Sequence, residues 1–112
     1  MQQFSIWMAQ LPVTNGYILR GMHPVIVVSN NLVNRYSPVI TAIPLTSKLK
    51  RWDLQTHVLI RGQGLTCDSM ALCEQILTLD RTTLVRRMGH IVNAQDRMAL
   101  IRGIGVQLGL VH

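Results

Sequence analysis

The sequence predicts a mainly β domain that ends in an α-helix and folds as a small antiparallel barrel or sandwich. Two runs rich in Val and Ile, residues 24–30 and 38–45, have the length and the Gly, Pro and Asn boundaries of strands buried on both faces. Turn pairs such as Asn15-Gly16 separate further short apolar runs. The clearest helix signals lie in residues 93–109.

The size and composition of the chain indicate one soluble domain. With 112 residues and 48% hydrophobic content, we expect a single domain over residues 1–112 with one core. The longest apolar runs fall short of the roughly 20 residues that cross a bilayer, so a membrane protein is excluded. The first residues lack the basic segment and apolar run of a signal peptide, and we therefore expect a cytoplasmic protein.

The N-terminal part of the chain is expected to form a strand and a hairpin loop. In residues 4–11, Phe4, Ile6 and Met8 recur at period two, which predicts a strand with one face in the core. Residues 12–21 then form the loop or hairpin that leads to the next strand.

The two buried strands carry polar residues at their ends. His23 stands at the beginning of the first, and the polar segment 30–37 joins the two. Pro44 has no backbone donor and indicates a sheet edge, a bulge or a strand end. The following segment, 46–53, is the most basic short loop of the chain.

The remaining elements are expected to be short. Strands are predicted at residues 55–61 and 69–79, separated by a Gly-Gln-Gly turn at 62–64. A short helix is predicted at 80–87 and a final strand at 88–92.

The C-terminal helix has a cap and an apolar stripe. Asn93 is a good N-cap, and Asp96 falls in the first turn. We expect the residues that repeat at helical spacing to pack on the sheet: Ala94, Met98, Ile101, Gly105 and Leu108. Gly103 and Gly105 each weaken the helix by roughly 1 kcal/mol relative to Ala, which indicates close packing against another element.

The charge of the chain favours a polyanionic partner. Eleven Lys and Arg against five Asp and Glu give a net charge of +6, and a small cationic domain attracts phosphates. Nucleic acid is therefore the first candidate, and arginine suits both phosphate oxygens and unpaired bases. Solubility is the alternative explanation for the same charge.

The cysteines and histidines indicate neither a disulfide nor a metal site. Cys67 and Cys73 would stand roughly 20 Å apart on one extended segment, far beyond disulfide reach, so free thiols are expected. The four histidines lack zinc-ligand spacing with the cysteines. We expect no metal and no cofactor.

Several phrases, in order along the chain, resemble the MazF/PemK family of toxin endoribonucleases. They are Gly21-Met22-His23-Pro24, Pro44-Leu45-Thr46-Ser47, Thr56-His57-Val58, Asp68-Ser69, Glu74-Gln75-Ile76 and Thr78-Leu79-Asp80-Arg81. The resemblance implies an SH3-like barrel, a homodimer, and metal-independent cleavage of single-stranded mRNA at short sequences. It also implies restraint by a cognate antitoxin peptide, and DNA is a possible partner through an antitoxin complex.

The resemblance implies a catalytic pair at the two strand ends, with one departure. Thr46 matches the threonine of the family, whereas His23 replaces its arginine, and the normally polar segment before it is largely apolar. Histidine, with an ordinary pKa near 6.5, can exchange protons, and Arg20 could supply the lost charge. The alternative is that His23 is a degenerate replacement in a silent member that binds nucleic acid or an antitoxin peptide in a regulatory role.

Further residues are candidates for RNA contact. The group comprises Tyr17, Arg20, Ser47, Lys48, Lys50, Arg51, Trp52 and Gln75. An aromatic side chain flanked by cations is how single strands are held, which favours the Trp52 loop. The alternatives are a solvated basic loop, ordinary strand-end hydroxyls at Thr46 and Ser47, and a buried strand amide at Gln75. His57 and His90 are interpreted as structural.

Overall fold

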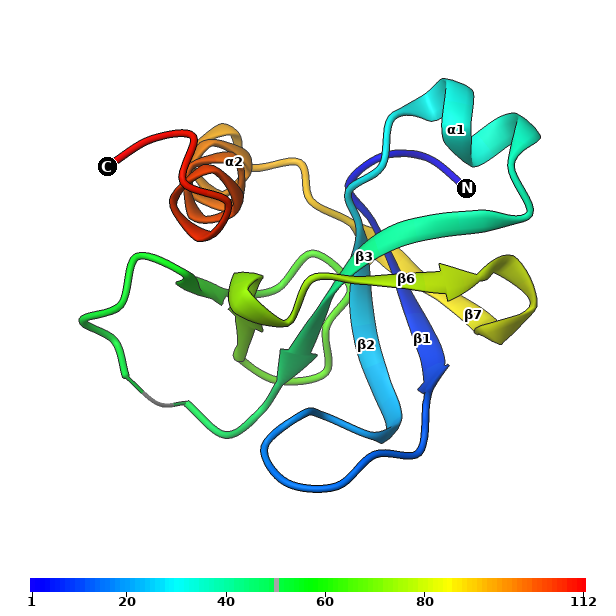
Figure 1. Ribbon diagram of the computed structural model, residues 1–112, viewed down its shortest axis with the longest axis horizontal. Coiled ribbons are helices and arrows are strands. Elements are labelled where there is room, and N and C mark those ends of the chain that lie inside the picture. The colour runs from blue at the N-terminus through cyan, green and yellow to red at the C-terminus, as the bar shows by residue number, and fades with distance from the viewer. Residues whose placement is uncertain (50) are drawn as a thin grey trace.

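A twisted antiparallel sheet with one long helix beside it forms the body of the protein (Figure 1). The computed structural model describes residues 1–49 and 51–112. The strands are β1 (Ser5–Leu11), β2 (Gly21–Val27), β3 (Val39–Thr46), β4 (His57–Ile60), β5 (Ser69–Leu72), β6 (Leu77–Asp80) and β7 (Leu84–His90). The helical elements are α1 (Asn31–Tyr36), α2 (Ala94–Gln107) and the 3-10 turns η1 (Cys73–Gln75) and η2 (Arg81–Thr83).

Strand β3 lies at the centre of the sheet and changes partner along one edge. The order is β4-β5-β3-β2-β1-β7, with β6 paired to the first half of β3. On that edge β6 pairs with residues up to Ala42 and β5 pairs from Leu45 onward. Pro44 falls in the gap between the two partners, where no ladder donor is needed.

Strand β1 has two buried faces, so the prediction of a single core face was wrong. Phe4 and Ile6 belong to one apolar cluster with α2, whereas Ala9 and Leu11 belong to a second cluster on the other side. The sheet is twisted strongly enough that both sides of this strand are covered, which the alternation alone could not reveal.

The two ends of the strand order, β4 and β7, are not paired with each other, so the pairing leaves the sheet open. The loop after β4 nevertheless touches β7, because the His90 amide donates to the Gln63 carbonyl at 3.3 Å. Gly64 and Gly89 meet so closely that a Cβ on either would overlap the backbone of the other segment. The fold is therefore mainly antiparallel β with a C-terminal helix.

Four predicted elements differ from those observed. The polar segment 30–37 contains helix α1, begun by Asn30, whose side chain accepts the Val33 amide at 2.9 Å. The single strand predicted at 69–79 is broken by η1, which is fixed by a hydrogen bond from the Cys73 amide to the Thr56 carbonyl at 2.8 Å.

The helix predicted at 80–87 is only the turn η2 followed by β7, and the final strand is Leu84–His90 rather than 88–92. The Asp80 carboxylate accepts the Thr82 amide and hydroxyl and so caps the start of η2. These bonds lower the pKa of Asp80 below its usual range.

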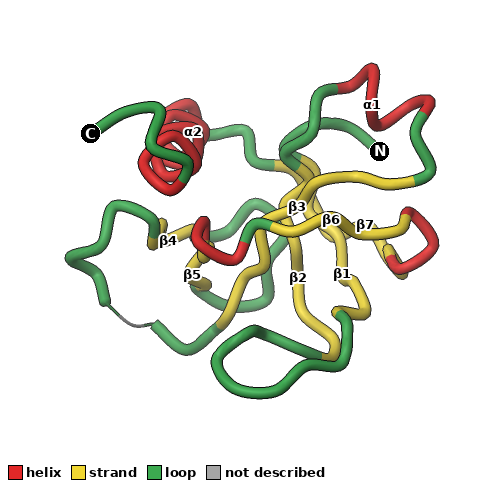
Figure 2. The backbone as a smooth tube through the Cα atoms, in the orientation of Figure 1, coloured by secondary structure: helices red, strands yellow, loops and turns green. Residues whose placement is uncertain are grey.

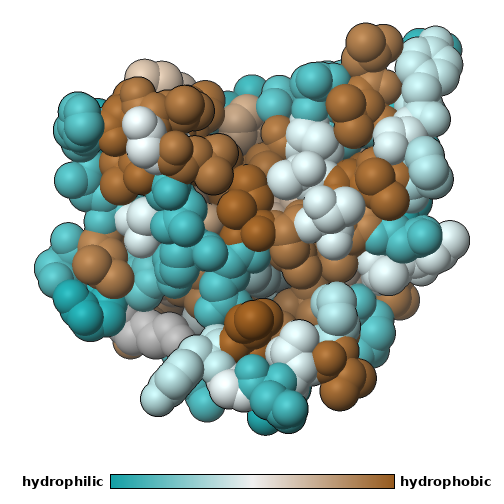
Figure 3. Space-filling model, in the orientation of Figure 1, coloured by the Kyte–Doolittle hydropathy of each residue, from teal (hydrophilic) through white to brown (hydrophobic). Residues whose placement is uncertain are grey.

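Helix α2 begins after Asn93 as predicted, but it packs through a different face. Leu100, Gly103 and Gly105 are buried, whereas Met98, Ile101 and Leu108 of the predicted stripe are exposed. Small residues bring the helix close to η1, as predicted for the glycines, since a Cβ at Gly103 would lie 2.7 Å from Cys73 Sγ. In Figure 3 the apolar surface over α2 is visible at the upper left. No helix in residues 1–49 and 51–112 has the length and apolar character needed to cross a membrane.

Candidate active site at the ends of β2 and β3

Antiparallel pairing brings His23, near the start of β2, to the end of β3. Its ring Nδ1 lies 3.1 Å from the Leu45 carbonyl oxygen. Because a carbonyl can only accept, Nδ1 carries the proton in this arrangement, and Nε2 keeps the lone pair of the neutral ring. The ring is half-buried and oriented by the backbone of the neighbouring strand.

A groove of about 240 Å³ opens beside His23. Its walls come from β1, β2, the end of β3 and the segment before β5: Met8, Met22, His23, Pro24, Leu45, Ser47, Leu65, Thr66, Cys67 and Ser69. The groove thus combines an imidazole with hydroxyl groups and an apolar floor. This set can bind a base or a sugar and offers a proton acceptor beside it.

Thr46 lies next to this groove but does not line it. Its side chain is 4% exposed, and its Oγ1 accepts the Lys48 amide at 3.2 Å. The hydroxyl therefore closes the turn after β3, in the manner of an ST-turn. Ser47, one residue later, is exposed and does line the groove.

The segment 12–20, visible as the loop between β1 and β2 at the bottom of Figure 2, carries Tyr17 and Arg20. Tyr17 is 98% exposed. The Arg20 guanidinium donates to the Thr14 carbonyl at 3.0 Å and so folds over its own loop. Both side chains are open to a large ligand, although the groove around His23 is lined by other residues.

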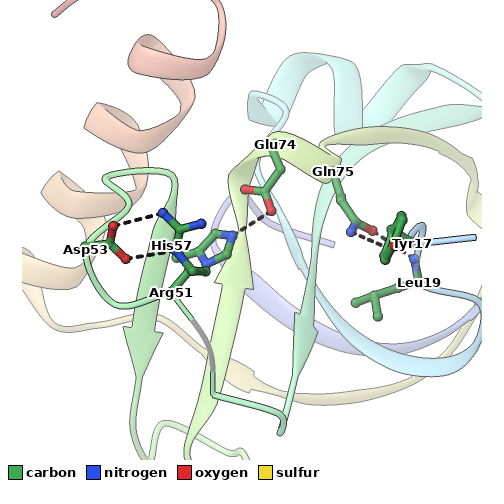
Figure 4. Close-up of polar contacts among 7 residues, drawn as sticks. All are labelled: Tyr17, Leu19, Arg51, Asp53, His57, Glu74 and Gln75. Carbon is green, nitrogen blue, oxygen red and sulfur yellow. Dashed lines mark hydrogen bonds and ion pairs between the residues drawn. The ribbon is translucent and has the colours of Figure 1, made fainter.

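Gln75 lies in η1, outside any strand, so the strand-amide interpretation of this residue was wrong. Its Oε1 accepts the Leu19 amide at 2.8 Å, and its Nε2 donates to the Tyr17 carbonyl at 3.0 Å (Figure 4). Both ends of the amide are thereby engaged with the β1–β2 loop.

The side chains of the basic loop after β3 lie in different places, some near the groove and others toward β4 and α2. Lys48 is exposed near the groove, while Arg51 forms a two-bond pair with Asp53 at 3.0 and 3.1 Å. That hydrogen-bonded pair lowers the pKa of the Asp53 carboxyl and raises that of Arg51. Trp52, 59% exposed, lines a separate cavity between β4 and α2. Lys50 lies outside the described residues.

The other titratable side chains are held within the fold. His57 Nε2 lies 2.7 Å from Glu74 Oε1, and the His57 side chain is only 5% exposed. Both cysteines are free, as predicted; Cys67 is exposed, and burial raises the pKa of Cys73 to about 12. In the part of the chain that the structure describes, no cluster of three or more His, Cys, Asp and Glu side chains could hold a metal ion.

Sequence reasoning missed the groove wall formed by residues 65–67 and 69. Asp68 in the same segment pairs with Arg61 at 3.5 Å. The available signal was the group of small polar residues Thr66, Cys67 and Ser69 just before a buried strand, the same kind of pattern that singled out Thr46.

Comparisons with known proteins identify the family and the fold. Residues 2–108 match the family described as PemK-like, MazF-like toxin of type II toxin-antitoxin system. The chain is 29% identical to Endoribonuclease MazF of Staphylococcus saprophyticus over 98% of its length and 92% of the relative. It is 33% identical to Endoribonuclease EndoA of Bacillus subtilis over 78% of its length and 77% of the relative. The structure of Mycobacterium tuberculosis toxin MazF-mt6 superposes with a TM-score of 0.79 at 25% identity, covering 96% of this chain and 99% of that one.

Proposed function

The chain belongs to the family of PemK-like, MazF-like toxins of type II toxin-antitoxin systems, and from this premise we propose that it is an endoribonuclease that cleaves single-stranded RNA. The observation that carries the proposal is His23, oriented by the Leu45 carbonyl and set in a groove beside Ser47. Two relatives of similar length are named endoribonucleases, which supports the same activity here.

The proposed chemistry uses the 2′-hydroxyl of the RNA as the nucleophile. His23 Nε2 takes the 2′-hydroxyl proton as that oxygen attacks the adjacent phosphorus, and the bond to the 5′-oxygen breaks. The products are a 2′,3′-cyclic phosphate and a 5′-hydroxyl, whose proton comes from an acid or from water. Lys48 and Arg20, both exposed near the site, are proposed to contact the phosphates, and Tyr17 and Trp52 to stack on bases.

Incubation of the purified protein with a long mRNA in EDTA, followed by sequencing of the fragment ends, tests the proposal. We expect discrete fragments with 2′,3′-cyclic or 3′-phosphate ends, without added metal. RNA that stays intact between pH 5 and pH 8 would contradict the activity.

A silent family member is the second candidate, and the burial of Thr46 favours it. If the threonine hydroxyl is required, its bond to the Lys48 amide keeps it from substrate. The protein would then bind RNA or an antitoxin peptide without cleaving. The H23R variant separates the two, because an inert wild type with a cleaving H23R variant supports the silent interpretation.

The proposed assembly is a homodimer of SH3-like barrels that binds an acidic antitoxin peptide. The contact between the loop after β4 and β7, described above, supports closure of the sheet into a barrel. Exposed apolar side chains on and after α2 support a dimer: Met98, Ile101, Leu108 and Leu110. The net charge of +6 supports the acidic peptide. Sedimentation that shows only a 12.6 kDa species at micromolar concentration would contradict the dimer.

A further inference from the structure

Two consecutive residues of η1 contact the β1–β2 loop and the start of β4, on opposite sides of the turn. Glu74 binds His57, the first residue of β4 after the basic loop, and Gln75 binds the β1–β2 loop on the other side. Figure 4 shows these contacts in a row, from Arg51 and Asp53 through His57 and Glu74 to Gln75 and Tyr17. The turn therefore touches the β1–β2 loop on one side and the first residue of β4 on the other.

The turn itself is anchored to the fold. The Cys73 amide donates to the Thr56 carbonyl at 2.8 Å, the Cys73 side chain is fully buried, and Gly103 of α2 packs directly on its sulfur. An anchor of this kind can position a partner, because its own backbone and side chains are fixed by packing.

The β1–β2 loop, in contrast, has little structure of its own. Its internal bonds run from the Thr14 hydroxyl to the Ile18 carbonyl and from Arg20 to the Thr14 carbonyl. Within residues 1–49 and 51–112, the hydrogen bonds that join segment 12–20 to the rest of the protein are the two made by the Gln75 amide. The Leu19 side chain adds an apolar contact with the second core cluster.

We propose that Gln75 is a positioning residue for RNA cleavage, which fixes the β1–β2 loop so that Tyr17 and Arg20 meet the substrate beside His23. The Gln75 oxygen and nitrogen each bind the loop backbone, at Leu19 and Tyr17, so the contacts that the amide makes in the fold are with the loop. The proposal rests on the proposed endoribonuclease function, which it deepens.

The Q75A variant tests the proposal through two measurements. Hydrogen exchange at the Leu19 amide should accelerate about tenfold, because its acceptor is lost. The KM for cleavage of a mixed-sequence single-stranded transcript should rise about tenfold with kcat changed less than threefold, as loss of substrate positioning predicts. Q10A is the matched control, since Gln10 is an exposed glutamine of β1 whose amide contacts the carbonyl of the adjacent Leu11.

The Q75E variant adds a rescue that a direct RNA contact would not give. An ionised carboxylate accepts the Leu19 amide but repels the Tyr17 carbonyl, whereas a protonated carboxyl restores the donor. Relative to wild type at the same pH, protection at Tyr17 to Leu19 should therefore recover as the pH falls toward 4.

The outcomes separate this inference from the proposed function. If wild type cleaves the transcript and Q75A raises KM with unchanged exchange at Leu19, Gln75 contacts RNA directly and the positioning role is wrong. If exchange accelerates but KM and kcat match those of Q10A, the loop position does not matter for cleavage and the inference is also wrong. If wild type fails to cleave, the proposed function fails, and with it the substrate on which this inference rests.

Discussion

The candidate site contains the start of β2 and the end of β3, and the two differ in whether their polar side chain is open to the groove. His23 follows the β1–β2 loop and lines a groove, with one ring nitrogen bound to the Leu45 carbonyl. Thr46 precedes the basic loop and is almost fully buried, and its hydroxyl oxygen accepts a hydrogen bond from the Lys48 amide. Proximity in the sheet therefore does not make the two residues chemically equivalent.

The difference indicates that the start of β2 and the end of β3 have different roles in the site. A proton acceptor needs a free lone pair, and the contact of Nδ1 with the Leu45 carbonyl leaves that of Nε2 in the neutral ring of His23. A hydroxyl that accepts a backbone N–H acts first on the shape of the turn. We therefore assign the chemistry to the β2 end and the shaping of the basic loop to the β3 end, and the predictions below test this assignment.

Removal of the imidazole should have the largest effect. H23A is expected to lower kcat for RNA cleavage by about 100-fold or more, the usual contribution of a general acid or base. The free energy of unfolding should change little, because the ring is only half-buried. Single-turnover cleavage of a defined transcript measures the loss, with Q10A as the control. A loss below threefold would move the chemistry away from β2.

Overpacking beneath η1 should affect both ends together. In G103V the new side chain meets Cys73 Sγ and the Gln55 carbonyl, and overpacking of this kind costs about 1–3 kcal/mol. We expect the free energy of unfolding in urea to fall by that amount, and cleavage to weaken, since η1 contacts the β1–β2 loop and the start of β4. A94V adds the same side chain at an exposed position of the same helix and should leave the midpoint nearly unchanged. Equal midpoints in the two variants would show that η1 tolerates displacement.

Removal of the Thr46 hydroxyl should have a smaller effect, on stability rather than on rate. T46V keeps the branched shape but leaves the Lys48 amide without its acceptor, at a cost of about 1 kcal/mol. We expect kcat within about threefold of wild type. T78V, at an exposed strand threonine, controls for the substitution itself. A 100-fold loss of kcat in T46V would instead place this hydroxyl in the reaction.

The sequence could predict features set by local residue patterns, but not those set by contacts between distant segments. The meeting of His23 with the end of β3 follows from two adjacent buried strands, and the cap at Asn93 follows from local residue types. The turn η1 could not be predicted, because it depends on Thr56 and Gly103, which are distant in the sequence. The contact of Gln75 with Leu19 spans 56 residues and leaves no periodic signal.

The helix face shows a second limit of sequence reasoning. The stripe Ala94, Met98, Ile101, Gly105 and Leu108 was assigned to the core, yet Gly105 is the one member of the five that is buried, together with Leu100 and Gly103. A close approach to η1 selects small residues, so the buried face is the less hydrophobic one in composition. Helix amphipathicity predicts the buried face only where large side chains fill the space between the helix and its neighbour, and not where the two backbones approach closely.

The smallest predicted effect lies at the other edge of the sheet, and it must be known before any pH profile of cleavage is assigned to His23. Arg97 Nη2 donates to His90 Nε2 at 3.0 Å, which requires the neutral ring. Burial, and then the charges of Arg97 and Arg87, lower the pKa of His90 below its ordinary value. Above the ordinary histidine pKa, near 6.5, both the folded and the unfolded chain carry a neutral ring and stability is unaffected.

Below that pH the unfolded chain binds a proton that the folded chain binds less well, so stability falls as the pH decreases from about 6.5 toward the lowered folded value. In H90Q the side chain can still accept from Arg97 but does not titrate. We expect the free energy of unfolding, measured in urea at pH 7.5 and pH 5.0, to fall less in H90Q than in wild type. An equal fall in both would contradict the role of His90. If the fall is smaller, cleavage measured in the H90Q background reports the pH dependence of the reaction at the β2 end without this loss of folded protein.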